Sequence, residues 1–288
     1  MGQWHIGVIG GSGLAGGVGL ENAQEIAVES PFGEPSAAVT TGMLEGVRVT
    51  FLPRHGAGHA IPPASVNYRA NIDVLKRCGV TDVIALSAIG SLRADMAPGQ
   101  MVAVDQFIDR TVSRPASFFG PGLVAHVSLA DPVCPRLSSG LADAVEGEGG
   151  VVHRGGTYVA IEGPQFSTRA ESLLYRSWGG DVIGMTGMPE ARLAREAELP
   201  YALLGMVTDY DAWRSDEAGV EASDVLAVMH ANVALAGKVL RRFLAGLPGQ
   251  RAPSPIDRAL EHAVMKAKTA RDPVLAAKLD AIAGRVLR

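Results

Sequence analysis

The sequence of 288 residues is short of several residue types and patterns, and each shortage excludes a class of protein. Cys78 and Cys134 are the only cysteines and form no C-x-x-C pair, so neither a disulfide framework nor a structural zinc site is indicated. No apolar run approaches the roughly 18 residues that a membrane-spanning helix requires. No charged segment with a cleavage signal opens the chain. We therefore expect a soluble, cytoplasmic protein with no membrane partner.

An excess of positive charge is also missing. The 26 lysines and arginines are outnumbered by 30 aspartates and glutamates, which gives a formal net charge of −4 at pH 7. Nonspecific binding to nucleic acid needs a positive field over the protein surface, so we expect no nucleic acid partner. The chain is 47% hydrophobic, with 35 glycines and 17 prolines spread along it, and its length suits one large α/β domain.

Short apolar runs alternate along the chain with segments of helical periodicity. The expected strands span residues 5–9, 47–52, 82–87, 101–105, 158–161, 181–185 and 201–208, and the expected helices span residues 66–78, 168–178 and 189–197. Strands that are continuously apolar predict an α/β fold in which a single domain has a central mixed sheet flanked by helices on both faces. Active sites of such folds collect at the carboxyl ends of the strands.

Two loop-rich segments and a break near the end complete the expected organisation. Residues 30–46 predict turns or a hairpin, and residues 113–125 predict a long loop. From residue 223 onward the pattern is helical, with a break at residues 247–249. We expect residues 1–248 to form the main domain and residues 249–288 to form a helical extension that packs on it.

The first glycine-rich segment, residues 11–16, reads G-x-G-x-x-G directly after a strand and permits two functional interpretations. A dinucleotide site needs a helix after the glycines and an acidic residue about 20 residues on; Glu29 fits the second requirement, but further glycines weaken the helix. Ser12 offers a hydroxyl and unhindered backbone N–H groups that suit a single phosphate ion. A plain tight turn is the structural alternative.

Two other strand ends carry candidate anion ligands. Arg54 and His55 follow one strand, and a guanidinium fork beside an imidazole donor suits a phosphate oxyanion. A surface arginine and a satisfied loop histidine are an equally good interpretation on local grounds. Ser87 ends another strand among small residues and glycine, which indicates either an anion site or an ordinary turn.

A polar loop and a pair of carboxylates complete the candidates. In residues 161–171, Phe166 can cover a planar ring, whereas Ser167 or Thr168 is expected to cap the next helix. Asp209 and Asp211 share one face if the chain stays extended, and like charges this close raise one pKa.

An aminopurine matches this pair of carboxyl groups, because its N6 amine needs an acceptor and its N7 can take a proton. A 6-oxopurine would want an amide donor instead. Helix capping or cation binding is the alternative, although divalent sites recruit more oxygen ligands.

Taken together, the ordered motifs resemble a known family over residues 6 to about 244. They are residues 10–14, 54–56, 66–71, 88–93, 105–111, 162–167, 184–186 and 208–213. The chain resembles the trimeric purine nucleoside phosphorylases and, within them, the branch that cleaves 5′-methylthioadenosine. The resemblance implies phosphorolysis to adenine and 5-methylthioribose 1-phosphate in purine and methionine salvage. It also implies a homotrimer, inorganic phosphate as co-substrate, and neither a metal nor an organic cofactor.

The resemblance also implies roles for individual residues. Phosphate contacts fall on Ser12, Arg54, His55, Ser87, Ala88 and Thr186, and base and ribose contacts on Phe166, Met185 and Thr208. Asp209 is expected to protonate N7 and Asp211 to accept from N6 during catalysis. The helical spacing of Ala222, Val225 and Leu226 places them on one face, which suits either an apolar slot for the methylthio group or ordinary core packing. The resemblance implies that His126 of the neighbouring subunit completes this slot.

Small departures from the family pattern leave alternatives open. Gly184 stands where asparagine is frequent, Ile89 where cysteine is frequent, and Ser12 and Ser87 where threonine is common. Residues 184–190 also resemble the methylthioinosine branch, which lacks the paired aspartates. The alternatives are a phosphorylase for methylthioinosine, 6-oxopurine or general purine nucleosides, a dinucleotide-dependent oxidoreductase, and a purine-binding regulator without activity.

Overall fold

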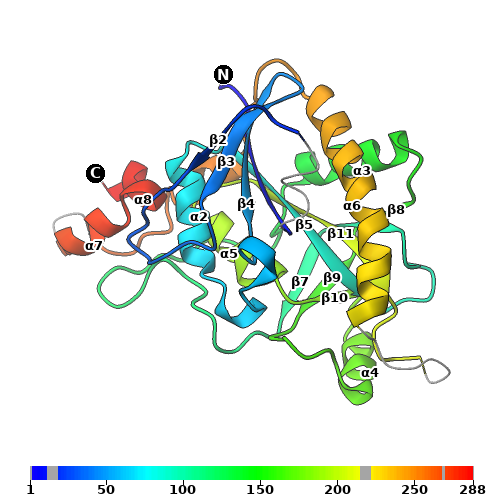
Figure 1. The fold of residues 1–288 in the computed structure, drawn as a ribbon. Coiled ribbons are helices and arrows are strands. Elements are labelled where there is room, and N and C mark those ends of the chain that lie inside the picture. Colours follow the sequence, from blue (N-terminus) through cyan, green and yellow to red (C-terminus); the bar gives the residue numbers. More distant parts are fainter. Residues whose placement is uncertain (1, 12–18, 215–221, 268–269, 288) are drawn as a thin grey trace.

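A mixed sheet organises the chain in the computed structural model, which describes residues 2–11, 19–214, 222–267 and 270–287 (Figure 1). Its eleven strands are β1 (His5–Gly10), β2 (Glu21–Ile26), β3 (Val39–Leu44), β4 (Val47–Pro53), β5 (Asp82–Ser91), β6 (Met101–Val104), β7 (Gln106–Asp109), β8 (Val152–Arg154), β9 (Thr157–Ala160), β10 (Val182–Gly184) and β11 (Tyr201–Asp209). The helices are α2 (Tyr68–Arg77), α3 (Pro135–Gly147), α4 (Arg169–Ser177), α5 (Gly187–Glu196), α6 (Ala222–Ala245), α7 (Pro273–Lys278) and α8 (Asp280–Leu287). The 3-10 turns are η1 (Ala57–His59), η2 (Pro63–Ser65) and η3 (Pro255–Arg258).

The long strand β5 is the centre of the sheet. It pairs in parallel with β1 on one side and with β11 on the other, and its last residues pair antiparallel with β10. β1 also pairs in parallel with β4. The carboxyl ends of these parallel strands therefore meet at one edge, where a site is expected in an α/β sheet.

Helices cover both faces of this sheet, as its apolar strands predict. Val83 and Ala85 belong to a core cluster that includes Leu193 of α5 and Ile282 of α8. Their neighbours Ile84 and Leu86 belong to a second cluster that includes residues of α3 and α6. Because successive residues of a strand point to opposite faces, β5 contributes to both hydrophobic layers. The predicted fold class is confirmed.

The expected elements are present, with boundaries that shift by a few residues, and the differences have physical reasons. The expected strand 101–105 ends at Val104, and β7 begins at Gln106 against a different partner, β9. β2 was not expected, because its sequence ENAQEI is polar and five of its six residues are exposed. The segment 30–46 contains turns and the first strand of a hairpin, β3, whose partner β4 follows directly at Val47.

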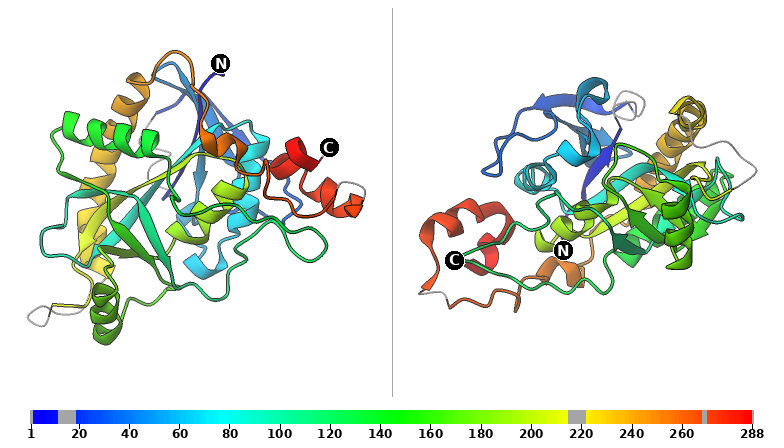
Figure 2. Two further views of the ribbon diagram at one scale, coloured as in Figure 1. Left: turned by 180° about the vertical axis from the view of Figure 1, so that it is seen from behind. Right: turned by 90° about the horizontal axis from the view of Figure 1, so that it is seen from below.

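The tail that follows α6 folds back against the sheet domain. Leu260, Leu279 and Ile282 join the first core cluster. Arg285 of α8 forms an ion pair of 2.7 Å with Glu198, next to α5. Figure 2 shows α7 and α8 at one end of the molecule, far from α6. Among the residues that the structure describes, there is no helix with the length and apolar composition needed to span a bilayer.

Candidate active site

The parallel strand ends place Arg54 deep in the protein, directly after β4. Its backbone N–H donates to the carbonyl of Gly10 at the end of β1, 2.9 Å away. The side chain is 2% exposed, so the interpretation as a surface arginine is wrong. Its Nε donates to Glu190 Oε2 at 2.9 Å, and its Nη1 donates to the carbonyl of Leu86 at 3.2 Å. Burial opposes its charge, but the Glu190 carboxylate outweighs this effect and raises the pKa of the guanidinium.

His55 is buried beside Arg54 and is uncharged at neutral pH. Burial is the main reason that its pKa is lowered to about 4, and the neighbouring arginine charge adds to the effect. Its Nδ1 lies 2.8 Å from the carbonyl oxygen of Ile61, which can only accept, so Nδ1 carries the hydrogen. The donor of the neutral ring is therefore used within the protein, so the expected imidazole donor to phosphate is wrong, and Nε2 can only accept a hydrogen from a protonated phosphate oxygen. The ring stacks on His59 with centroids 4.2 Å apart.

Two hydroxyl groups lie close to each other near Arg54. Ser87, in β5, and Thr186, at the start of α5, are both buried, and their side-chain oxygens lie 3.2 Å apart. The Ser87 hydroxyl also donates to the carbonyl of Ala88 at 3.1 Å. Because Leu86 accepts from Arg54 one residue earlier, these groups share one edge of the sheet. Ser12 lies outside the described residues.

The two aspartates lie farther along the same strand pair. Asp209 is paired in register with Gly90 of β5, three residues beyond Ser87 and therefore roughly 10 Å from it along an extended strand. Asp209 Oδ2 accepts from the Thr208 hydroxyl at 2.7 Å, and Oδ1 accepts from the backbone N–H of Asp211 at 2.8 Å.

The chain does not stay extended through this pair, as a shared face would require. β11 ends at Asp209, and Asp211 adopts a left-handed conformation with φ of 49°. Burial, with a smaller contribution from the Asp209 charge, raises the pKa of Asp211. Its Oδ2 has no hydrogen-bond partner of good geometry among the described residues, and the same holds for the hydroxyls of Ser167 and Ser172 beside it. Ser172 was not predicted, because it lies within a helix pattern.

The loop after β9 lies open to solvent at its aromatic residue. Phe166 is 43% exposed. Thr168 caps α4 through a capping box with Glu171, as predicted. Gly163 has φ of 66° and packs against Met185, so a side chain at Gly163 would overlap the Met185 sulfur. The loop and the segment that precedes α5 are therefore packed together.

Arg114, in the long loop after β7, joins these segments and was not predicted. Its Nη1 donates to the carbonyls of Met185 at 2.5 Å and Met188 at 2.9 Å, and to the Tyr68 hydroxyl at 2.9 Å. Its Nη2 donates to the carbonyls of Ile161 at 3.3 Å and Glu162 at 2.6 Å. Its Nε completes the set with Glu162 Oε1 at 3.2 Å. No local pattern reveals this role, because every partner is distant in sequence.

The remaining predicted residues are not brought to this edge by described contacts. The side chains of Ala222, Val225 and Leu226 lie outside the described part of the structure. His126 is exposed, and its backbone N–H donates to the carbonyl of Ala263 in the tail at 2.9 Å. In the described ranges, no group of three or more His, Cys, Asp or Glu residues could hold a metal ion.

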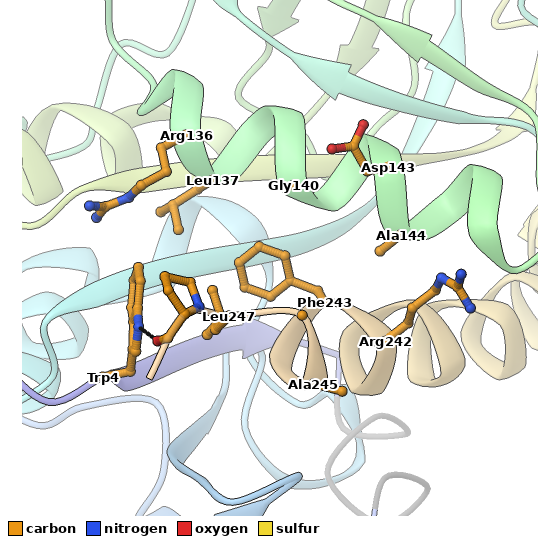
Figure 3. Close-up of a pocket in the computed structure, with 12 residues that line it drawn as sticks. Trp4, Arg136, Leu137, Gly140, Asp143, Ala144, Arg242, Phe243, Ala245 and Leu247 are labelled. Atoms are coloured by element: carbon orange, nitrogen blue, oxygen red, sulfur yellow. Dashed lines mark hydrogen bonds between the residues drawn. The ribbon is translucent and has the colours of Figure 1, made fainter. Parts of the chain in front are cut away.

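A cleft of about 580 Å³ lies elsewhere, between α3 and α6 (Figure 3). Trp4, Arg136 and Phe243 line it, and none of the predicted site residues does. Trp4 precedes β1, and Arg136 binds Asp82 at the first position of β5, so the cleft lies at the amino ends of the strands. It is therefore separate from the candidate site.

Comparisons with known proteins agree on one family. Residues 5–245 match the model of the Phosphorylase superfamily. The chain is 54% identical over 290 residues to an S-methyl-5′-thioadenosine phosphorylase of Bradyrhizobium diazoefficiens, with 100% of both chains covered. It is 56% identical over 289 residues to the enzyme of the same name from Cereibacter sphaeroides, with 98% of each covered.

Comparison with solved structures identifies the same family. A methylthioadenosine phosphorylase from an Antarctic soil metagenomic library superimposes with a TM-score of 0.92 at 43% identity, covering 98% of this chain and 99% of that one. The Schistosoma mansoni methylthioadenosine phosphorylase in complex with adenine gives 0.79 at 36% identity, with 84% and 91% covered. Because the family model spans most of the chain and relatives more than half identical align along nearly all of it, this chain belongs to the phosphorylase superfamily.

Proposed function

We propose that the chain catalyses the phosphorolysis of 5′-methylthioadenosine. Inorganic phosphate attacks C1′ as the N-glycosidic bond breaks, and adenine and 5-methylthioribose 1-phosphate leave. One observation carries the proposal: full-length relatives more than half identical to this chain bear the name of this activity. This favours a phosphorylase over a dinucleotide-dependent oxidoreductase and over a purine-binding regulator.

The phosphate end of the proposed site consists of Ser12, Arg54, His55, Ser87, Ala88 and Thr186. The transition state resembles an oxocarbenium ion, so the protein has to hold the phosphate in line and stabilise charge that develops on the leaving purine. The buried arginine and the paired hydroxyls of Ser87 and Thr186 support this assignment, because donors fixed before the substrate arrives need no reorganisation.

The base end consists of Phe166, Met185, Thr208 and the two aspartates. Asp209 supplies the proton to N7, and Asp211 accepts from the N6 amine. The buried carboxyl group of Asp211 supports the second role, because its Oδ2 makes no hydrogen bond of good geometry with the nearby hydroxyls of Ser167 and Ser172 and can accept from an amino group. A 6-oxopurine presents an acceptor at that position, which an ionised carboxylate cannot bind, and this argues against the alternative specificity.

The proposal extends to the assembly and its setting. We propose a cytoplasmic homotrimer in which His126 of a neighbouring subunit joins Ala222, Val225 and Leu226 around the methylthio group. Phosphate is the co-substrate, no metal or organic cofactor takes part, and nucleic acid is not a partner. Residues 249–288 are proposed to extend the same domain, since their leucines and Arg285 pack against it. The pathway is purine and methionine salvage.

One assay tests the reaction and its specificity. Methylthioadenosine, adenosine, inosine and methylthioinosine are each incubated with the protein, with and without phosphate, and base release is measured. We expect adenine release from methylthioadenosine that requires phosphate or arsenate. Equal release without phosphate would identify a hydrolase, and faster release of hypoxanthine from methylthioinosine would establish the alternative specificity.

A further inference from the structure

We infer that Glu190 is a positioning residue that determines which N–H of Arg54 faces the phosphate. The inference rests on the proposed function, since it takes Arg54 as a phosphate ligand. Glu190 lies in the first turn of α5 and is 2% exposed. It is not a candidate contact for either substrate, and its role follows from what it does to the arginine.

Both carboxylate oxygens of Glu190 are held in place. Oε2 accepts from Arg54 Nε at 2.9 Å, and Oε1 accepts from Arg54 Nη2 at 3.2 Å. Oε1 also accepts from the hydroxyl of Tyr201, at the start of β11, at 2.8 Å. The two-point contact with the guanidinium fixes its plane. The Tyr201 hydroxyl holds Oε1 and so prevents the Glu190 carboxylate from rotating together with the guanidinium of Arg54.

A count of donors shows what this arrangement leaves for a ligand. A guanidinium has five N–H groups. Glu190 receives one from Nε and one from Nη2, the second Nη2 hydrogen points to the carbonyl of Ile9 at 3.5 Å, and one Nη1 hydrogen goes to the carbonyl of Leu86. One N–H, on Nη1, therefore has no acceptor among the described residues. Its nitrogen also binds the carbonyl of Leu86, one residue before Ser87, so we assign this N–H to the phosphate.

The charge of Glu190 works against this positioning role, which makes the two effects separable. A buried carboxylate next to an anion site repels the anion and cancels the arginine charge. His55 adds no charge, since its ring is neutral. If Glu190 served only to neutralise Arg54, removing its charge would tighten phosphate binding. If it positions Arg54, removing it weakens phosphate binding in spite of the gain in net positive charge.

The test uses Glu190→Gln in the full-length protein and measures binding of radiolabelled inorganic phosphate by equilibrium dialysis. The amide keeps the shape but turns one acceptor into a donor, so the two-point contact is lost. We expect the phosphate Kd to rise by about tenfold, as for the loss of one charge-assisted hydrogen bond. The KM for phosphate should rise with it, while the KM for the nucleoside stays within about twofold.

Glu196→Gln is the matched control. Glu196 lies at the last position of α5, is 6% exposed, and accepts from the Ser117 hydroxyl and the Phe118 N–H, both at 2.7 Å. It makes no contact with Arg54, so its replacement should change stability without changing the phosphate Kd. Equal effects of both variants on phosphate binding would overturn the inference.

Tyr201→Phe provides a second route if Glu190→Gln does not fold. It keeps the ion pair and removes only the hydroxyl that holds Oε1, so we expect a smaller rise in phosphate Kd, about twofold to fivefold. Tighter or unchanged phosphate binding in a folded variant would overturn the inference. So would a wild-type protein that binds no phosphate. A wild-type protein that binds phosphate but cleaves no nucleoside would refute the proposed function alone.

Discussion

Replacing Arg114 by lysine should loosen the loop after β9 and the segment that precedes α5, which surround the nucleoside in the proposed function. Arg114 donates to six oxygens, counting the Tyr68 hydroxyl, four carbonyls and Glu162 Oε1. Arg114 has five N–H groups for these oxygens, whereas a lysine ammonium has three hydrogens on a single atom, so at least two donors are lost. A planar fork that reaches in several directions cannot be replaced by a point charge.

The expected magnitude follows from the cost of leaving buried acceptors unpaired. Each costs about 1–3 kcal/mol, and part of this is recovered where water or the lysine reaches one of them. For two lost donors, the free energy of unfolding should therefore fall by ~2–4 kcal/mol. This is a large part of the 5–15 kcal/mol that is typical of a folded domain. Because Met185 and Glu162 are held through their backbone, the KM for the nucleoside should rise as well.

Circular dichroism during heating and steady-state kinetics measure the two effects. The matched control is Arg154→Lys, because Arg154 also binds carboxylates, at 2.7 Å from Asp143 and 2.8 Å from Glu146, but is 44% exposed. Exposed ion pairs contribute little, so the control should shift stability by no more than about 0.5 kcal/mol. If Arg114→Lys unfolds at the same temperature as Arg154→Lys and keeps the wild-type KM for the nucleoside, the argument from the oxygens that Arg114 binds is refuted.

Three other predictions concern the base, pH and assembly. Asp209→Asn should sharply reduce adenine release while 6-oxopurine nucleosides become relatively favoured, because an amide cannot give a proton to N7; full activity on methylthioadenosine would remove Asp209 as the donor. Burial lowers the pKa of His5 to about 4 from 6.5, so the folded state binds fewer protons between these values and stability falls as the pH falls through this window. His5→Gln should flatten that dependence in acid unfolding curves, whereas replacing the exposed His262 by glutamine should not. Light scattering should give a trimeric mass, and an active monomer would contradict this. Leu226→Asp should abolish the preference for methylthioadenosine over adenosine, since a carboxylate beside a thioether is costly to bury; a variant that keeps the preference would contradict this.

The sheet was predictable because its central strands contain long apolar runs. β5 has nine buried residues among its ten, and this kind of strand is recognised from composition alone. β2 is polar and exposed and therefore has no such signal. At the candidate site, too, only residues that belong to a recognisable local pattern could be predicted. The anion candidates at strand ends came from local patterns, since each is a short motif that follows a strand.

The groups that hold those candidates in place could not be predicted. Glu190 is 136 residues from Arg54, and Arg114 reaches partners 46 to 74 residues away. Hydrogen-bond partners at this separation leave no periodicity or spacing in a single sequence. The turn at Asp211 was missed for a different reason. A left-handed residue inside a short polar segment depends on the Asp209 side chain that caps it, and not on a pattern of hydrophobicity.

Because Arg251 binds the carboxylate of Asp82, folding at the start of the central strand β5 depends on a residue that is synthesised late. Asp82 is completely buried at the first position of β5 and is bound by Arg136 and by Arg251, which follows it by 169 residues. Burying a charge before its partners are present is unfavourable, and contacts between such distant residues form slowly. We therefore expect the start of β5 to stay accessible on the ribosome until Arg251 has emerged. Pulsed proteolysis of stalled nascent chains would show protection only in chains long enough to expose that arginine.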